Sequence, residues 1–294
     1  MLLLDIMLVA TTTAIACSSL GLFLVLKGVA LMSDAISHTV IFGIVSAYLL
    51  FKTFNSTILA LGAMCTGIIT VWLTEILIST EKIYKEVAVG LVFPLLFSLG
   101  TLLICQYTAS LHLDVDMVLL GEITLASLKR IIISGVDYGP SSFWFMTAIM
   151  LLNVSFIACF YRSLQLCIFD PNTANLYNMH PKIIYYGLIV LVSLTIVSAL
   201  EVVGSLVAVA LMIIPAATAL LSTDVTIKNI LMITVQYAAF ATIVGCVIGF
   251  YFDVSIGGCI AIVLGICFFG TFLRTKTEAH FFRKPSSFLP FSKK

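Results

Sequence analysis

The chain has 294 residues, of which 61% are hydrophobic and only 10% are charged, and its mean hydropathy is +1.19. Soluble domains carry about 25% charged residues, so this composition excludes an ordinary soluble enzyme and a disordered chain. A transmembrane helix needs about 20 apolar residues, which leaves material for roughly eight or nine spans. The net charge of +1 arises from few, scattered charges and gives no indication of nucleic-acid binding.

Nine apolar runs, separated by short polar clusters, predict an all-α, polytopic helical bundle within residues 1–273. The stretch 108–141 differs from them, because six charged residues are interleaved with apolar ones. We interpret it as an outer amphipathic or re-entrant segment that lies outside the bundle. The predicted spans are 6–26, 30–51, 56–78, 87–107, 142–161, 183–200, 202–221, 230–252 and 256–273.

The basic residues predict the orientation, because Lys and Arg concentrate in cytoplasmic loops. With nine spans and a cytoplasmic C-terminus, twelve of the 15 basic residues fall on the cytoplasmic side, six of them in the tail 274–294. Only Lys52, Lys129 and Arg130 fall on the other side. The N-terminus is therefore predicted to face outward and the basic tail to lie in the cytoplasm.

Asp34 and His38 lie within the second predicted span, where ionisable groups are costly and suggest a function. Their spacing of four residues places them on one face of a helix. A carboxylate and an imidazole together can bind a divalent transition metal, and without a thiolate they suit manganese, iron(II) or zinc. A two-ligand site releases its ion easily, as transport requires. Alternatively, the two side chains form a buried hydrogen-bonded pair that ties two helices together.

Other acidic residues lie toward the predicted outer side. Glu201 is placed where the chain turns between the sixth and seventh spans, either as a solvated turn residue or to attract cations. Asp114, Asp116 and Glu122 give the segment 108–141 an acidic edge that would attract cations or a basic partner surface.

The polar segment 168–181 has the signals of a short helix outside the membrane. Asp170 is a suitable N-cap and Pro171 a suitable first helical residue. Asn178 tolerates the left-handed conformation that ends a helix, and Pro181 prevents its continuation. Such a helix either closes a loop or docks a partner.

Two further patterns concern helix packing and ATP hydrolysis. Gly245 and Gly249 form a GxxxG pair that permits close helix packing, within the bundle or between subunits; packing within the bundle is the simpler interpretation. The chain contains no GxxxxGK[ST] loop, so it does not hydrolyse ATP by that route.

Three motifs, in order, resemble the permease subunits of manganese/zinc/iron ABC importers. Residues 30–38 are similar to the family stretch L-x-G-D-A-x-S-H, with Ser33 in place of the glycine. Residues 169–178 are similar to its F-D-P-x-x-A-x-x-x-G coupling loop, with Asn178 in place of the glycine. Residues 202–219 are similar to its V-V-G-x-L-L…I-I-P-A-A-x-A run.

The resemblance implies a fold like that of the cobalamin and siderophore ABC importer permeases, in a bacterial cytoplasmic (inner) membrane. It implies a second permease subunit, a cytoplasmic dimer of ABC ATPase subunits, and an extracytoplasmic metal-binding protein. Manganese, zinc or iron would be the transported substrate, with no permanently bound cofactor and no enzymatic activity in this chain. Asp34 and His38 would coordinate the metal, and Asp170, Pro171, Ala174 and Asn178 would belong to the coupling helix that contacts the ATPase.

Two other classes of membrane protein compete with this interpretation. An ion-coupled secondary metal transporter would use Asp34 and His38 as a proton relay and need no ATPase, but such transporters often contain internal inverted repeats, and we find none. An intramembrane metalloprotease would need a zinc-binding HExxH motif, which the sequence lacks.

Overall fold

The computed structural model describes residues 2–53, 55–80, 82–107, 123–128, 130–133, 136–170, 174, 181–222 and 226–281. Within these ranges, nine helices are long and apolar enough to cross a membrane. This finding confirms the predicted all-α bundle. The helices are α1 (Leu2–Lys27), α2 (Leu31–Phe51), α3 (Ser56–Ser79), α4 (Lys85–Tyr107), α7 (Ser141–Phe169), α9 (Pro181–Val203), α10 (Ser205–Ser222), α11 (Ile227–Phe252) and α12 (Ile256–Phe281).

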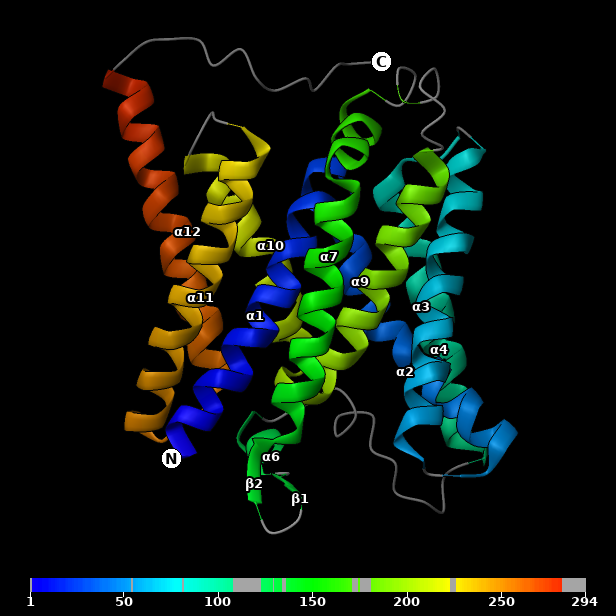
Figure 1. Cartoon of the computed structure of the whole chain (residues 1–294). Coiled ribbons are helices and arrows are strands. Elements are labelled where there is room, and N and C mark those ends of the chain that lie inside the picture. The colour runs from blue at the N-terminus through cyan, green and yellow to red at the C-terminus, as the bar shows by residue number, and fades with distance from the viewer. Residues whose placement is uncertain are drawn as a thin grey trace.

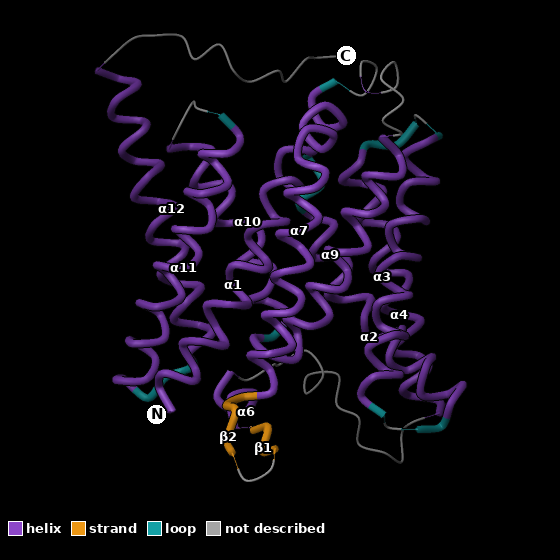
Figure 2. Tube along the Cα trace, viewed as in Figure 1, coloured by secondary structure: helices purple, strands orange, loops and turns teal. Residues whose placement is uncertain are grey.

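Successive long helices run in alternating directions, so the start of α1 and the end of α12 lie at opposite ends of the bundle (Figure 1). We refer to the end where α1 begins as the N-terminal end, and to the other as the opposite end. The short helix α6 (Ile123–Leu128) and the antiparallel hairpin of β1 (Arg130–Ile133) and β2 (Val136–Pro140) lie at the N-terminal end (Figure 2). α4 ends and α7 begins at that same end.

Helix α7 is longer than the sequence predicts. The prediction ends the fifth span at 161, because Arg162 begins a polar cluster, but the helix continues to Phe169. Phe160 departs from helical geometry (φ −105°, ψ 15°), so the extension follows a kink. A charged side chain does not end a helix by itself, because a helix can extend beyond the membrane where its polar residues are solvated.

Helix α1 lies at the centre of the bundle and is the most buried of the candidate spans. Asn153 of α7 connects it to its neighbours: its amide nitrogen donates to the Ala16 carbonyl at 3.3 Å and to the Thr195 hydroxyl of α9 at 2.9 Å. Polar side chains inside a membrane bundle need such partners. The contacts tie α1, α7 and α9 together, and α7 and α9 are the two helices that flank the segment 170–180.

Glycines let several helix pairs approach closely. A Cβ at Gly245 would lie 2.6 Å from the Cα of Ile260, and one at Gly249 would lie 2.9 Å from the Cα of Ile256. The GxxxG pair of α11 therefore packs against α12, which confirms the interpretation of packing within the bundle.

A still closer approach, between α1 and α10, predicts a large loss of stability. A Cβ at Gly21 of α1 would lie 1.9 Å from the backbone oxygen of Met212 in α10. We expect Gly21→Ala to lower the free energy of unfolding by about 2–3 kcal/mol, because overpacking forces the backbone apart. Thermal unfolding in detergent measures this, with Gly265→Ala of α12 as the control, since nothing lies within 4 Å of a Cβ there. Equal melting temperatures for the two variants would contradict the packing of α1 on α10.

Candidate metal centre

The candidate metal centre lies in the first two turns of α2. α1 ends at Lys27, and Gly28 adopts a positive φ of +70° that lets the chain turn into α2 after two more residues. Ala30 provides no side-chain cap for α2. Asp34 lies in the first turn, where the positive end of the helix dipole favours a carboxylate.

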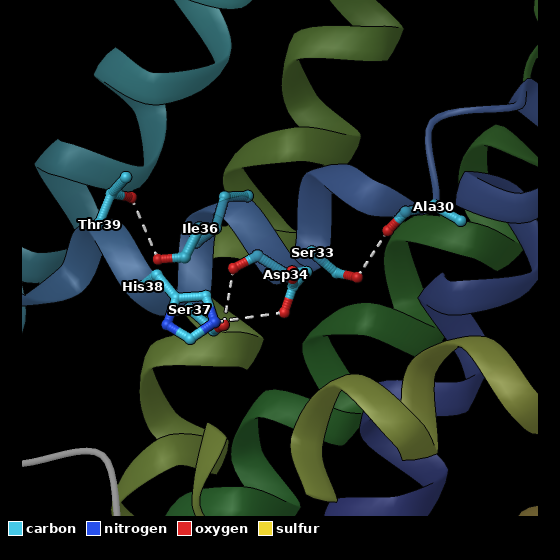
Figure 3. A network of polar contacts seen from close by, with 7 residues as sticks. All are labelled: Ala30, Ser33, Asp34, Ile36, Ser37, His38 and Thr39. Carbon is cyan, nitrogen blue, oxygen red and sulfur yellow. Dashed lines mark hydrogen bonds and ion pairs between the residues drawn. The ribbon is translucent and has the colours of Figure 1, made fainter. Parts of the chain in front are cut away.

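Asp34 and His38 project from the same side of α2, with an imidazole nitrogen facing a carboxylate oxygen (Figure 3). The distance from His38 Nε2 to Asp34 Oδ1 is 3.5 Å. The His38 side chain is 34% exposed and that of Asp34 is 45% exposed. Both residues belong to α2, and both side chains are partly exposed in this subunit.

Two phenylalanines of α4 flank the His38 imidazole. Its ring centroid lies 5.9 Å from that of Phe93 and 6.1 Å from that of Phe97, the latter in an edge-on arrangement. Such tilted and edge-on contacts are the favoured geometries of aromatic pairs. They hold the imidazole on the side of α2 that carries Asp34.

The hydroxyl groups of the neighbouring serines are hydrogen-bonded within α2. The Ser33 hydroxyl donates to the Ala30 carbonyl and the Ser37 hydroxyl donates to the Asp34 carbonyl, both at 2.7 Å (Figure 3). Both residues are fully buried. Ser33, which stands where the family motif has glycine, is therefore accommodated by a local bond within α2.

The back of α2 is held firmly against α3. The Thr70 hydroxyl of α3 donates to the Thr39 hydroxyl at 2.9 Å. One turn further along, a Cβ at Gly43 would lie 2.5 Å from the Gly62 backbone oxygen. This close packing fixes the face of α2 opposite the Asp34–His38 pair, so the pair is presented by a rigid helix.

Among the described residues, no group of three or more His, Cys, Asp or Glu side chains could hold a metal ion. The described part of this subunit therefore offers two side-chain ligands at the Asp34–His38 pair. A bound ion needs further ligands from water, from the backbone or from another chain.

The predicted coupling segment is described at two of its four named residues. Asp170 has non-helical backbone angles (φ −143°, ψ 81°), and its carbonyl accepts a bond from the N–H of Ala174 at 3.0 Å. An N-cap residue has both properties, since its carbonyl accepts the first bond of the next helix. Ala174 is fully buried. Pro171 and Asn178 lie outside the described residues.

The predicted outer acidic residues are described in part. Glu201 is exposed near the end of α9, and Gly204 (φ +82°) turns the chain directly into α10, as the sequence predicts. Asp114, Asp116 and Glu122 lie outside the described residues. A cavity of about 940 Å³ opens beside this turn, lined by residues 203–207 and 253–258 among others, but it does not include Asp34 or His38.

Sequence reasoning missed three contacts between distant elements. Arg130 of β1 is paired with Asp5 of α1, the Lys27 ammonium lies 3.2 Å from the centroid of the Tyr185 ring, and the two phenylalanines of α4 contact His38. Each depends on which helices are neighbours, and a single sequence carries no signal for that.

A family comparison decides what kind of protein presents this pair. Residues 1–275 match the model of the ABC 3 transport family. The chain belongs to this family. The resemblance to permeases of manganese, zinc and iron ABC importers, which rested on the motifs around Asp34, Asp170 and Val202, is thereby confirmed.

Individual relatives are similar in sequence to this chain over most of their own length. The manganese transport system membrane protein MntD of Bacillus subtilis is 34% identical over 88% of this chain and 87% of its own length. The zinc transport system membrane protein TroD of Treponema pallidum is 39% identical over 90% of this chain and 71% of its own. Among solved structures, PsaBC from Streptococcus pneumoniae in complex with Fab matches with a TM-score of 0.73 and 25% identity, covering 92% of this chain and 91% of that one.

Proposed function

We propose that this chain is the permease subunit of a binding-protein-dependent ABC importer of divalent manganese, zinc or iron, energised by a separate ATPase. The observation that carries the proposal is the Asp34–His38 pair, held on one face of a transmembrane helix and open to a ligand. Transport systems for manganese and zinc among the relatives support this class of substrate.

The exposure of the pair supports a second permease subunit. An ionisable side chain that faces lipid is costly, so such residues face a bundle interior or a water-filled pathway. In this subunit Asp34 and His38 are 45% and 34% exposed, and the apolar side chain of Leu31, one turn before Asp34 on α2, is exposed as well. We infer that this face of α2 and α4 meets a second permease subunit, identical or related, around a central pathway.

The charge distribution supports an outward N-terminus. Of the basic residues with described side chains, Lys52 and Arg130 lie at or near the N-terminal end, whereas seven others lie toward the opposite end. By the rule that basic residues face the cytoplasm, the opposite end is cytoplasmic. Those seven residues are Lys27, Lys82, Lys85, Arg162, Lys228, Arg274 and Lys276.

This orientation assigns a partner to each end. The segment that follows α7 at Asp170 then lies in the cytoplasm, where an ATPase dimer would contact it. Asn153 ties α7 and α9, the two helices on either side of that segment, to the central helix α1, so a displacement of the segment would reach the core. The metal-binding protein would dock at the N-terminal end, where Glu201 and the described part of the segment 108–141 lie.

Transport then follows from transient coordination. A hydrated divalent ion gives up water ligands reluctantly, and the Asp34 carboxylate and His38 imidazole replace part of its hydration shell within the membrane. With only two side-chain ligands from each subunit, the ion is held loosely enough to leave. ATP-driven movement of the coupling segment would open the pathway on alternate sides.

Reconstitution into proteoliposomes tests this function against the secondary-transporter alternative. We expect uptake of radioactive manganese to require ATP, the ATPase subunit and the binding protein together with this chain. Omission of the ATPase, with a pH gradient imposed instead, should leave uptake at background. Metal import by this chain alone, driven by the pH gradient, would overturn the ABC mechanism.

A further inference from the structure

Helices α2 and α4 run side by side in the same direction, which aligns Asp34 with a particular turn of α4. His38 contacts Phe93 and Phe97, and Gly100 lies against the backbone of Phe42. Because the two helices are parallel, a step of one turn along α2 matches a step of one turn along α4. The residue one turn before His38 is therefore level with the residues one turn before Phe93 and Phe97. Asp34 therefore lies at the level of Gly90–Phe93.

That turn of α4 contains a backbone carbonyl without its usual helical partner. Pro94 lies inside α4, and proline has no N–H to donate to the carbonyl four residues earlier. That carbonyl belongs to Gly90, and in a helix it points along the axis toward residue 94.

Gly90 also leaves room for a ligand. It shares one face of α4 with Phe93 and Phe97, the rings that contact His38, since residues three and seven apart lie on one side of a helix. It is exposed, and nothing lies within 4 Å of where its Cβ would be. An open space, a carbonyl lacking its N–H partner and the Asp34–His38 pair thus coincide at one level of the subunit.

We propose that the Gly90 carbonyl is a third protein ligand of the transported ion, contributed directly or through one water molecule, and that Pro94 makes it available. This inference rests on the proposed function of Asp34 and His38. Carbonyl and carboxylate oxygens suit manganese, whereas imidazole suits zinc. The added oxygen therefore shifts the preference of the site toward manganese.

Restoring the missing N–H tests the proposal. In Pro94→Ala, the alanine N–H bonds the Gly90 carbonyl within the helix and withdraws it from the ion. We expect the Kd for Mn²⁺ to rise about tenfold, in the range seen when the groups that support a metal site are removed, while the Kd for Zn²⁺ changes less than about twofold. The measurement is a titration of the detergent-solubilised permease–ATPase complex with each metal alone, the binding protein being omitted.

A second variant probes the open space and keeps the test independent of helix straightening. Gly90→Ala adds a methyl group that meets no protein atom in this subunit but crowds an ion with six ligands more than one with four. We expect it also to weaken Mn²⁺ binding selectively, by about threefold or more, since Mn²⁺ favours octahedral and Zn²⁺ tetrahedral coordination.

Matched controls separate ligand loss from altered packing. Pro215→Ala changes the other proline that lies inside a described helix, and Gly270→Ala changes another exposed glycine with open space around its Cβ. Both should bind the two metals as the unmodified chain does. Equal weakening of Mn²⁺ and Zn²⁺ in Pro94→Ala, or no change for either metal, would overturn the assignment of the carbonyl.

The Asp34→Ala/His38→Ala double variant distinguishes this inference from the proposed function. If that variant loses binding of both metals while Pro94→Ala and Gly90→Ala bind normally, only the role of Gly90 is refuted. If the double variant binds both metals normally, the metal site itself is refuted.

Discussion

Replacement of Asp34 or His38 should abolish metal uptake while leaving the transporter assembled. In the proposed site each side chain is one of the two side-chain ligands from this subunit, and removal even of groups that only support a metal ligand costs about 10- to 100-fold. We therefore expect Asp34→Ala and His38→Ala each to reduce the uptake of Mn²⁺ by at least about 100-fold in proteoliposomes. Association with the ATPase and its ATP hydrolysis should persist.

The folded bundle should tolerate these changes, because the pair is partly exposed and the contact between the two side chains lies within α2. A helical ion pair at this spacing contributes only about 0.5 kcal/mol. The thermal unfolding temperature in detergent should therefore change little, in contrast to Gly21→Ala.

Two comparisons sharpen the result. Asp34→Asn preserves size and removes charge, and Asp253→Asn makes the same change at an exposed position that ends α11; only the first should lose uptake. The double variant should be no worse than the singles, because ligands that act as a unit are not additive. Normal uptake in both single variants would leave the pair as a local contact of α2 with no role in transport.

The number of spans was predictable because it depends on the length and hydropathy of each apolar run. Eighteen or more consecutive apolar residues are diagnostic of a membrane helix, and each of the nine predicted runs corresponds to a helix of the structure. The end of α7 was not predictable in this way. Arg162 indicates the end of the apolar run, whereas the helix continues past it to Phe169. Hydropathy reports where a segment leaves the apolar layer, which is not always where its helix ends.

Only the part of the candidate site that lies on a single helix was predictable. The spacing of Asp34 and His38 places them on one face of α2, and the structure has them there. The roles of Phe93, Phe97 and Gly90 depend on α4 packing beside α2 in a parallel register, which no local pattern specifies. The same limit explains the Asp5–Arg130 pair, whose members are 125 residues apart.

The hydrophobic periodicity of the sequence did not predict the hairpin of β1 and β2 either. The charged residues within 108–141 predicted a segment outside the bundle, and the described part of it does lie at the N-terminal end. Its form as a short helix followed by two strands was not predicted, because runs of four and five residues are too short for a reliable pattern.

The second large effect is expected at the coupling segment, where substitutions should separate ATP hydrolysis from transport. Asp170 ends α7 and begins the next turn, and Ala174 is fully buried one turn later. We expect Asp170→Ala to remove the side-chain oxygen that an N-cap uses, at a local cost of about 1 kcal/mol, and Ala174→Phe to force the segment out of its position. Both variants should retain the Asp34–His38 site and bind Mn²⁺ normally.

In the reconstituted transporter, we expect Ala174→Phe to reduce uptake about tenfold or more while ATP hydrolysis continues, because a benzyl group cannot fit where a methyl group is fully buried. Thr226→Ala provides a matched control for Asp170→Ala, since Thr226 begins α11 at the same end of the bundle and its carbonyl likewise accepts the first helical bonds. That control should keep the normal ratio of metal imported to ATP hydrolysed. A proportional fall of uptake and hydrolysis in all three variants would indicate a general loss of assembly, and the segment after α7 would then have no specific part in coupling.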